Sequence, residues 1–212
     1  VNHKMVVQSF LIAFGISYLG SIPPGVLNLT VIDISMRRAM KHAFLFSLAA
    51  GLIEFIQGFI ALQFSDYLAT HSEVEFYIQL FVVPVFIGLG IYYLLQKDPP
   101  DHELKKDNSS AFVKGVLLSI VNPLAIPFWL VWATYLSQKG FPILDGGINM
   151  YSFILGISFG SIATLMTYAY LSKLILSKIK SFNKWINEII GVILLVLGIF
   201  QAIAVMRMLE WI

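Results

Sequence analysis

A short interruption in an apolar run decides the fold: Gly20-Ser21-Ile22-Pro23-Pro24-Gly25-Val26-Leu27-Asn28. The run extends over residues 5–36, whereas about 20 residues cross a hydrocarbon core at a helical rise of about 1.5 Å per residue. The prolines remove two backbone donors and clash with the preceding turn, and Gly25 permits conformations that other residues avoid. Within a bilayer, freed backbone groups are tolerated only where protein or a watery cavity satisfies them. The stretch therefore predicts a broken helix and a candidate binding site.

The composition is that of an integral membrane protein. Hydrophobic residues make up 58% of the chain and charged residues 12%, about half the charged share of a soluble domain. The formal net charge of +2 is too small to indicate nucleic-acid binding. Because the chain has no cysteine, disulfides, cysteine metal sites and thiol redox chemistry are excluded.

Six apolar segments are each long enough to span a bilayer. They cover residues 5–36, 39–64, 76–96, 111–136, 148–176 and 185–206. All but three of the 14 lysines and arginines lie in or beside the loops after the first, third and fifth segments. The positive-inside rule places these loops in the cytoplasm and both termini outside. The first segment lacks a small-residue cleavage signature and further spans follow it, so we expect it to remain in the mature protein.

A polar linker at residues 97–110 separates two halves of three segments each, residues 1–96 and 111–212. The halves resemble each other, because Ser21-Ile22 leads to Pro23-Pro24 and Ser119-Ile120 leads to Asn122-Pro123. With three spans per half, the second half enters the bilayer from the opposite side, which predicts an inverted-topology repeat. The predicted fold class is all-α, with six transmembrane helices in two inverted repeats and helices 1 and 4 broken at proline. Simple packing kinks are the alternative.

After each break a half-helix begins, and its first turn presents unpaired N–H groups at the positive end of a dipole worth about half an elementary charge. In an inverted repeat, the ends at Pro24-Gly25 and Asn122-Pro123 would converge on one anionic group. The alternative is that Asn28 and Asn122 only satisfy backbone groups that the prolines free.

Glu54 lies near the centre of the second apolar segment, where an ionised side chain costs several kcal/mol. It shares a helix face with Gly51, Gln57 and Gly58. The fifth segment carries a similar stripe of Gly156, Gly160, Thr164 and Thr167. Facing stripes either pack two helices closely or line a polar cavity, and Glu54 favours the cavity because packing alone gives no reason to bury a carboxylate. The predicted binding residues are Pro24, Gly25, Asn28, Glu54, Gln57, Asn122, Pro123 and Thr164, with Glu54 as the proton-coupling residue.

Other polar and aromatic residues have simpler interpretations. Asp33 precedes Arg37 by four residues, where a helical ion pair explains it, and it is a weaker candidate. No histidine pair has metal-ligand spacing, and no nucleophile elbow, phosphate loop or nucleotide fingerprint is present. We therefore expect no enzyme activity, no metal site and no cofactor. Trp129, Trp132 and Tyr135 suit an interfacial aromatic belt, and ordinary lipid-facing aromatics are the alternative.

Three motifs carry a resemblance that covers the whole chain. They are Gly20-x-x-x-Pro24-Gly25, a glycine-bearing second segment, and Phe112-x-x-Gly115 leading to Asn122-Pro123. This pattern resembles the LysE/RhtB family of amino-acid exporters. That family often has Pro-Gly-Pro and Asn-Pro-Lys, where this chain has Pro24-Gly25-Val26 and Asn122-Pro123-Leu124. The resemblance implies a six-span protein of the bacterial cytoplasmic membrane that exports an amino acid, driven by the proton or membrane gradient.

The expected function is therefore secondary transport of a small zwitterion out of the cytoplasm. Backbone groups at Gly25 and Asn122 would hold the carboxylate, and Glu54 would pair with the ammonium or exchange a proton. One alternative is a divalent metal-cation exporter, although such an ion needs several oxygen ligands and the interior offers essentially one carboxylate. Another is a non-transporting membrane assembly subunit that binds a partner through its glycine faces. The expected partners are a small-molecule substrate and the lipid bilayer, and a homodimer stays open.

Overall fold

The structure is a computed structural model that describes residues 3–23, 25–70, 72–95, 110–122, 124–141 and 147–172, with shorter pieces at 174, 188, 191–192, 194–203, 205–207 and 209. Every regular element in these residues is an α-helix, which confirms the all-α prediction. The chain divides into two compact units. One comprises Val1–Asp66 and Lys106–Leu176, and the other comprises Tyr67–Lys105 and Ser177–Ile212.

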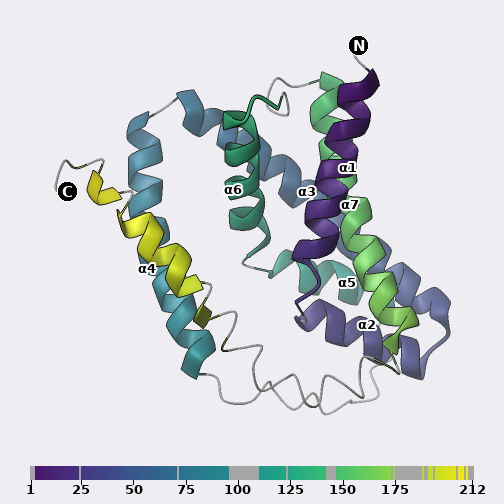
Figure 1. The fold of residues 1–212 in the computed structure, drawn as a ribbon. Helices are drawn as coiled ribbons and strands as arrows, with labels where there is room; N and C mark the ends of the chain where they lie inside the picture. Colours follow the sequence, from purple (N-terminus) through teal and green to yellow (C-terminus); the bar gives the residue numbers. More distant parts are fainter. Residues whose placement is uncertain are drawn as a thin grey trace. The chain divides into compact units, whose positions relative to one another are not determined.

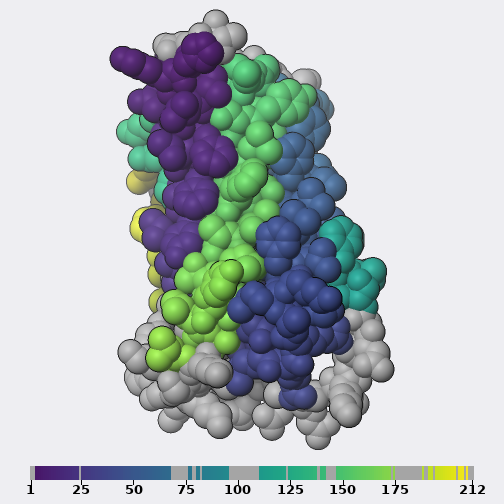
Figure 2. All heavy atoms as spheres, turned by 90° about the vertical axis from the view of Figure 1, so that its right-hand side faces the viewer, coloured from purple at the N-terminus to yellow at the C-terminus, as the bar shows by residue number. Residues whose placement is uncertain are grey.

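The first unit is a helical bundle. Helix α1 (His3–Gly20) and helix α7 (Gly147–Tyr170) run side by side (Figure 1 and Figure 2). Helix α3 (Met40–Thr70) belongs to this unit as far as Asp66. Helix α2 (Val26–Arg37) contacts both α7 and α5 (Ala111–Ile120), and α6 (Ala125–Gln138) follows α5.

Two of the predicted spans are interrupted near their middle. Helix α1 ends at Gly20 and α2 begins at Val26. Helix α5 ends at Ile120 and α6 begins at Ala125, and the axes of these two helices are bent by 62°. Both Pro24 and Pro123 lie outside the described residues, so their part in the breaks stays a prediction.

Within the described residues, two helices are long and apolar enough to cross a membrane, Met40–Tyr67 and Gly147–Tyr170. The bent pair of α5 and α6 provides a third if it is taken as one span. Shorter apolar helices lie at Val83–Leu95 and Leu194–Arg207. The arrangement of six spans in two inverted repeats stays a prediction.

Glycines bring the helices of the first unit close together. A Cβ atom added at Gly160 of α7 would lie 2.6 Å from the Phe14 carbonyl oxygen of α1. Glycines of α3 instead meet α7, because a Cβ atom at Gly51 would lie 2.5 Å from the Ile162 side chain. The sequence predicted that the small and polar faces of α3 and α7 meet each other, and this is wrong for the glycines of α7. They face α1, because α7 buries one face against α1 and another against α3.

The apolar core of the first unit corrects one further prediction. Trp129 is only 2% exposed and packs edge-on against Phe153, with ring centroids 6.0 Å apart. It therefore belongs to the core rather than to an interfacial belt. Tyr135, on the same helix, is 49% exposed. The two aromatic residues therefore point to different sides of α6, one buried and one exposed. The core cluster also includes Ala13, Ala61, Leu62, Ala133, Leu136, Met150, Ile154 and Ile157.

The second unit contains α4 (Ser72–Leu95) and the described parts of the C-terminal helix. Two of its glycine contacts are reciprocal. A Cβ atom at Gly90 would lie 2.7 Å from the side chain of Leu195, and one at Gly198 would lie 2.9 Å from that of Ile87. Leu195 lies about one helical turn before Gly198, and Ile87 lies about one helical turn before Gly90. The two contacts therefore have the same geometry with the roles of the helices exchanged.

Candidate functional site

Two side chains donate hydrogen bonds to backbone carbonyl oxygens within the first break. Asn28 of α2 donates through Nδ2 to the carbonyl oxygens of Ser21, at 2.8 Å, and Pro23, at 3.1 Å. The hydroxyl of Tyr168 on α7 donates to the Ile22 carbonyl oxygen. Carbonyls that have lost their helical donors thereby gain side-chain partners. Both amide protons of Asn28 are used within the break, as in the alternative that gave this residue a structural role.

The N-terminus of α2 remains open to a ligand. Gly25 is the N-cap residue, with an extended backbone at φ −120° and ψ −172° and no side-chain hydrogen bond to the first turn. Gly25 and Val26 are both exposed. The first turn of α2 can therefore offer its N–H groups and the positive end of its dipole to an anion.

The second break has a similar construction. The side chain of Gln57, on α3, donates through Nε2 to the Ser119 carbonyl oxygen at 3.0 Å. In an uninterrupted helix that carbonyl would accept from residue 123, which is proline and has no N–H. Within the break, the Asn122 side-chain oxygen accepts from the Leu124 N–H at 3.2 Å. The N-cap of α6 likewise has no side-chain hydrogen bond to the first turn.

Glu54 is buried in the middle of α3 and is 7% exposed. Its carboxyl interacts with the hydroxyl of Ser161 on α7. Nearby, the Ser158 hydroxyl donates to the Gly51 carbonyl oxygen at 2.8 Å. One hydroxyl does not compensate a buried carboxylate. The carboxyl is therefore stable in this place when it holds a proton or faces a cation.

Thr164 supports the end of α1. Its hydroxyl lies 3.0 Å from the Tyr18 carbonyl oxygen and 3.0 Å from the Gly160 carbonyl oxygen. The residue is 1% exposed, so its polar group is committed to these carbonyls. Thr164 therefore helps to hold the first break beside α7.

The predicted site residues fall into two groups in the structure. Gln57 reaches the end of α5 beside the Asn122 break, and Glu54 lies one turn earlier on the same helix. Asn28 and Thr164 stabilise the first break. Pro24 and Pro123 lie outside the described residues.

Three polar residues that contact these two groups were not predicted from the sequence. They are Ser119, Ser161 and Tyr168. A helical serine in an apolar segment is common and carries no signal by itself. A signal does exist for Ser161. Ser161 follows Glu54 by the same number of residues as Thr164 follows Gln57. Aligning the two halves of the sequence at this separation would have placed Ser161 opposite Glu54.

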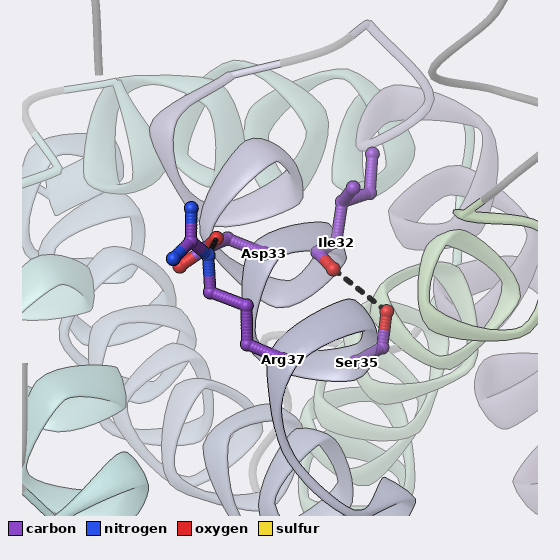
Figure 3. Close-up of polar contacts among 4 residues, drawn as sticks. All are labelled: Ile32, Asp33, Ser35 and Arg37. Carbon is purple, nitrogen blue, oxygen red and sulfur yellow. Dashed lines mark hydrogen bonds and ion pairs between the residues drawn. The ribbon is translucent and has the colours of Figure 1, made fainter. Parts of the chain in front are cut away.

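Asp33 forms the predicted ion pair with Arg37. The Arg37 Nε atom lies 2.5 Å from the Asp33 carboxylate, and the side chains are 42% and 23% exposed. Figure 3 shows the two side chains together on α2, with the Ser35 hydroxyl donating to the Ile32 carbonyl oxygen at 2.8 Å. An exposed pair of this kind contributes little to stability and lies apart from the buried groups described above.

Two comparisons with known proteins give matches to this chain. The family model described as "LysE type translocator" matches residues 8–204 of the chain. The chain is 28% identical over 188 residues to the Bacillus subtilis (strain 168) protein named "Putative amino acid efflux protein YcgF", which covers 85% of this chain and 88% of that protein. No solved structure matches the chain. The family match spans both helix breaks and Glu54, and the chain belongs to the LysE type translocator family of membrane transport proteins.

Proposed function

We propose that this translocator is a secondary transporter that exports a small zwitterion of the amino-acid class across the bacterial cytoplasmic membrane. The observation that carries the proposal is the buried Glu54 carboxyl, one helical turn from the side chain that reaches the second break. Intramembrane carboxyls that face the protein interior mark substrate or proton pathways. The similarity to a protein named for amino-acid efflux supports the choice of substrate class.

We further propose that six spans form two inverted repeats, with both termini outside. Helix pairing within the first unit supports this. The helix before the first break, α1, packs on α7, and the helix before the second break, α5, meets α3 at Gly115, where an added Cβ atom would lie 2.6 Å from the Phe46 carbonyl oxygen. The first part of each broken span therefore contacts the second span of the other half.

Equivalent positions of the two halves also meet, as expected beside a pseudo-two-fold axis. One sequence offset relates Gly51 to Ser158 and Glu54 to Ser161, and both pairs are in contact. The same offset relates Gln57 to Thr164. Each of these two side chains donates to a carbonyl at the end of the opposite half's broken helix. The reciprocal glycine contacts in the second unit have the same symmetry.

The proposed mechanism divides the zwitterion between opposite charges. The exposed N-terminus of α2 at Gly25 and the positive end of the α6 dipole beside Asn122 would hold the substrate carboxylate. Glu54 would face the ammonium group when substrate is bound and hold a proton when it is absent. Substrate and proton would then exchange at one carboxyl.

The test measures efflux from proteoliposomes that contain the purified chain and are loaded with a mixture of the twenty radiolabelled protein amino acids. An imposed pH gradient should drive efflux by the wild type, whereas Glu54→Gln keeps the shape of the side chain and should abolish the gradient-driven part. Asp33→Asn is the matched control, because it also neutralises an acidic residue but only in an exposed ion pair. Wild-type efflux by Glu54→Gln would reduce that carboxyl to a structural role, and no efflux of any amino acid by the wild type would refute the proposed function.

A further inference from the structure

Two buried oxygen atoms at the end of α5 have no hydrogen-bond partner within the described residues. They are Oε1 of Gln57 and Oγ of Ser119. Gln57 is 6% exposed and Ser119 is 1% exposed. Because leaving a buried polar atom unpaired costs about 1–3 kcal/mol, such atoms in a native protein call for a physical explanation.

Hydrogen bonding fixes the direction of the Gln57 amide. The Ser119 carbonyl oxygen can only accept, so the amide must turn its NH2 group toward that oxygen, 3.0 Å away. Oε1 is then directed elsewhere and is available to a donor. The Ser119 hydroxyl differs from that of Ser47, which donates to the Ala43 carbonyl oxygen of its own helix at 2.8 Å. Helical serines commonly make that local bond, and Ser119 does not.

The electrostatics at this end of α5 favour positive charge. The C-terminus of a helix carries the negative end of its dipole, and the last turn of α5 contains no basic residue. Glu54 lies three positions before Gln57 on α3, which places their Cβ atoms about 5–6 Å apart. A donor that reaches Oε1 therefore also lies near a carboxyl.

We propose that Gln57 Oε1 and Ser119 Oγ bind the ammonium group of the transported amino acid, an inference that rests on the proposed function. An ammonium group has three N–H donors. The site offers it an amide oxygen, a hydroxyl oxygen and the nearby Glu54 carboxylate. Across the same break α6 begins, and its N-terminus carries the positive end of a helix dipole. The break between α5 and α6 therefore presents both polarities, as a zwitterion requires.

Ser119→Ala tests this directly, because a partnerless buried hydroxyl can be removed with little or no loss of stability. The experiment measures counterflow of each of the twenty radiolabelled protein L-amino acids in proteoliposomes, for the wild type, for Ser119→Ala and for Ser47→Ala. The last variant is the matched control, since Ser47 is fully buried on α3 but already has a partner. For every amino acid that the wild type transports, Ser119→Ala should raise KM by about tenfold, the factor expected for one lost hydrogen bond to a charged group. Its Tm should equal that of the wild type.

Two further arms identify the occupant of the site. The 2-hydroxy acid that corresponds to the best amino acid lacks the ammonium group, so its weak competition should be the same for the wild type and Ser119→Ala. Replacing sodium by choline should leave the effect of the variant unchanged. Equal KM values for Ser119→Ala and Ser47→Ala would overturn the inference, and so would an effect of Ser119→Ala on sodium dependence alone, which would assign the site to a sodium ion. A wild type that moves none of the amino acids would instead refute the proposed function and the inference with it.

Discussion

The contact between α1 and α7 makes a prediction whose sign can be derived from the structure. A Cβ atom at Gly160 would lie 2.6 Å from both the Phe14 carbonyl oxygen and the Ser17 Cβ atom. Nonbonded carbon atoms prefer separations of about 3.5–4.0 Å, so Gly160→Ala must move the α1 backbone by roughly 1 Å. That shift would also lengthen the hydrogen bond that the Ser17 hydroxyl donates to the Ile157 carbonyl oxygen, which is 2.8 Å long in the structure.

Overpacking of this kind costs about 1–3 kcal/mol, and the better helix propensity of alanine returns at most about 1 kcal/mol. The two atoms nearest to a Cβ at Gly160 belong to the backbone or are fixed to it and cannot rotate away, so the upper part of this cost range applies. After the propensity gain is subtracted, Gly160→Ala should destabilise the protein by about 1–2 kcal/mol, which corresponds to roughly 2–8 °C in Tm for a chain of this size. Gly15→Ala is the control, because a Cβ atom at this position of α1 would meet nothing within 4 Å apart from its chain neighbours and the backbone of its own helix turn. It should raise the Tm slightly.

The assay follows thermal unfolding of the detergent-solubilised protein by fluorescence-detected size-exclusion chromatography. The expected order of Tm is Gly160→Ala below the wild type and the wild type below Gly15→Ala. A Gly160→Ala protein at least as stable as the wild type would show that α1 and α7 do not approach as closely as described, and the reasoning would fail.

Two further predictions concern topology and the breaks. In intact cells, single cysteines in this otherwise cysteine-free chain should react with a membrane-impermeant reagent at Ser72 and Gly146 but not at Ser109 and Ser181; the reverse pattern would overturn the orientation. Pro24→Ala and Pro123→Ala should each permit a straighter helix, withdraw N–H groups from the substrate and lower transport sharply while membrane insertion survives. Normal transport by both, measured in the counterflow assay, would make the prolines packing kinks.

The sequence predicts the breaks and the buried carboxyl because their signals are local. Paired prolines and a glycine in an apolar run mark an interruption wherever the chain goes next, and Glu54 is costly in any apolar span. The direction of each helix face is a different problem. Gly156 and Gly160 have the spacing of a packing stripe, but nothing in that spacing tells which neighbour they meet. Trp129 could not be separated from Tyr135 for the same reason.

Polar side chains at the breaks could be predicted only in part. Asn28 lies close to the first break in sequence, and its structural role followed as an alternative. Ser119 and Thr164 depend on contacts between segments that are far apart in the chain. The break deprives a carbonyl of its backbone donor in one half of the chain, and the side chain that replaces this donor comes from the other half. The pattern within one segment therefore cannot predict which side chain donates to which carbonyl.

The pair of Glu54 and Ser161 places different residue types at corresponding positions of the two proposed repeats. In a perfect repeat the offset that relates these positions would place two carboxyls in contact, and two like charges at that distance could not both ionise. A hydroxyl at the second position leaves a single carboxyl, which interacts with that hydroxyl. A single acidic group exchanges one proton or faces one ammonium, which matches a zwitterion with one cationic group. In the proposed mechanism this difference provides the one charge that the exchange needs, while Gln57 and Thr164 each support the end of one interrupted helix.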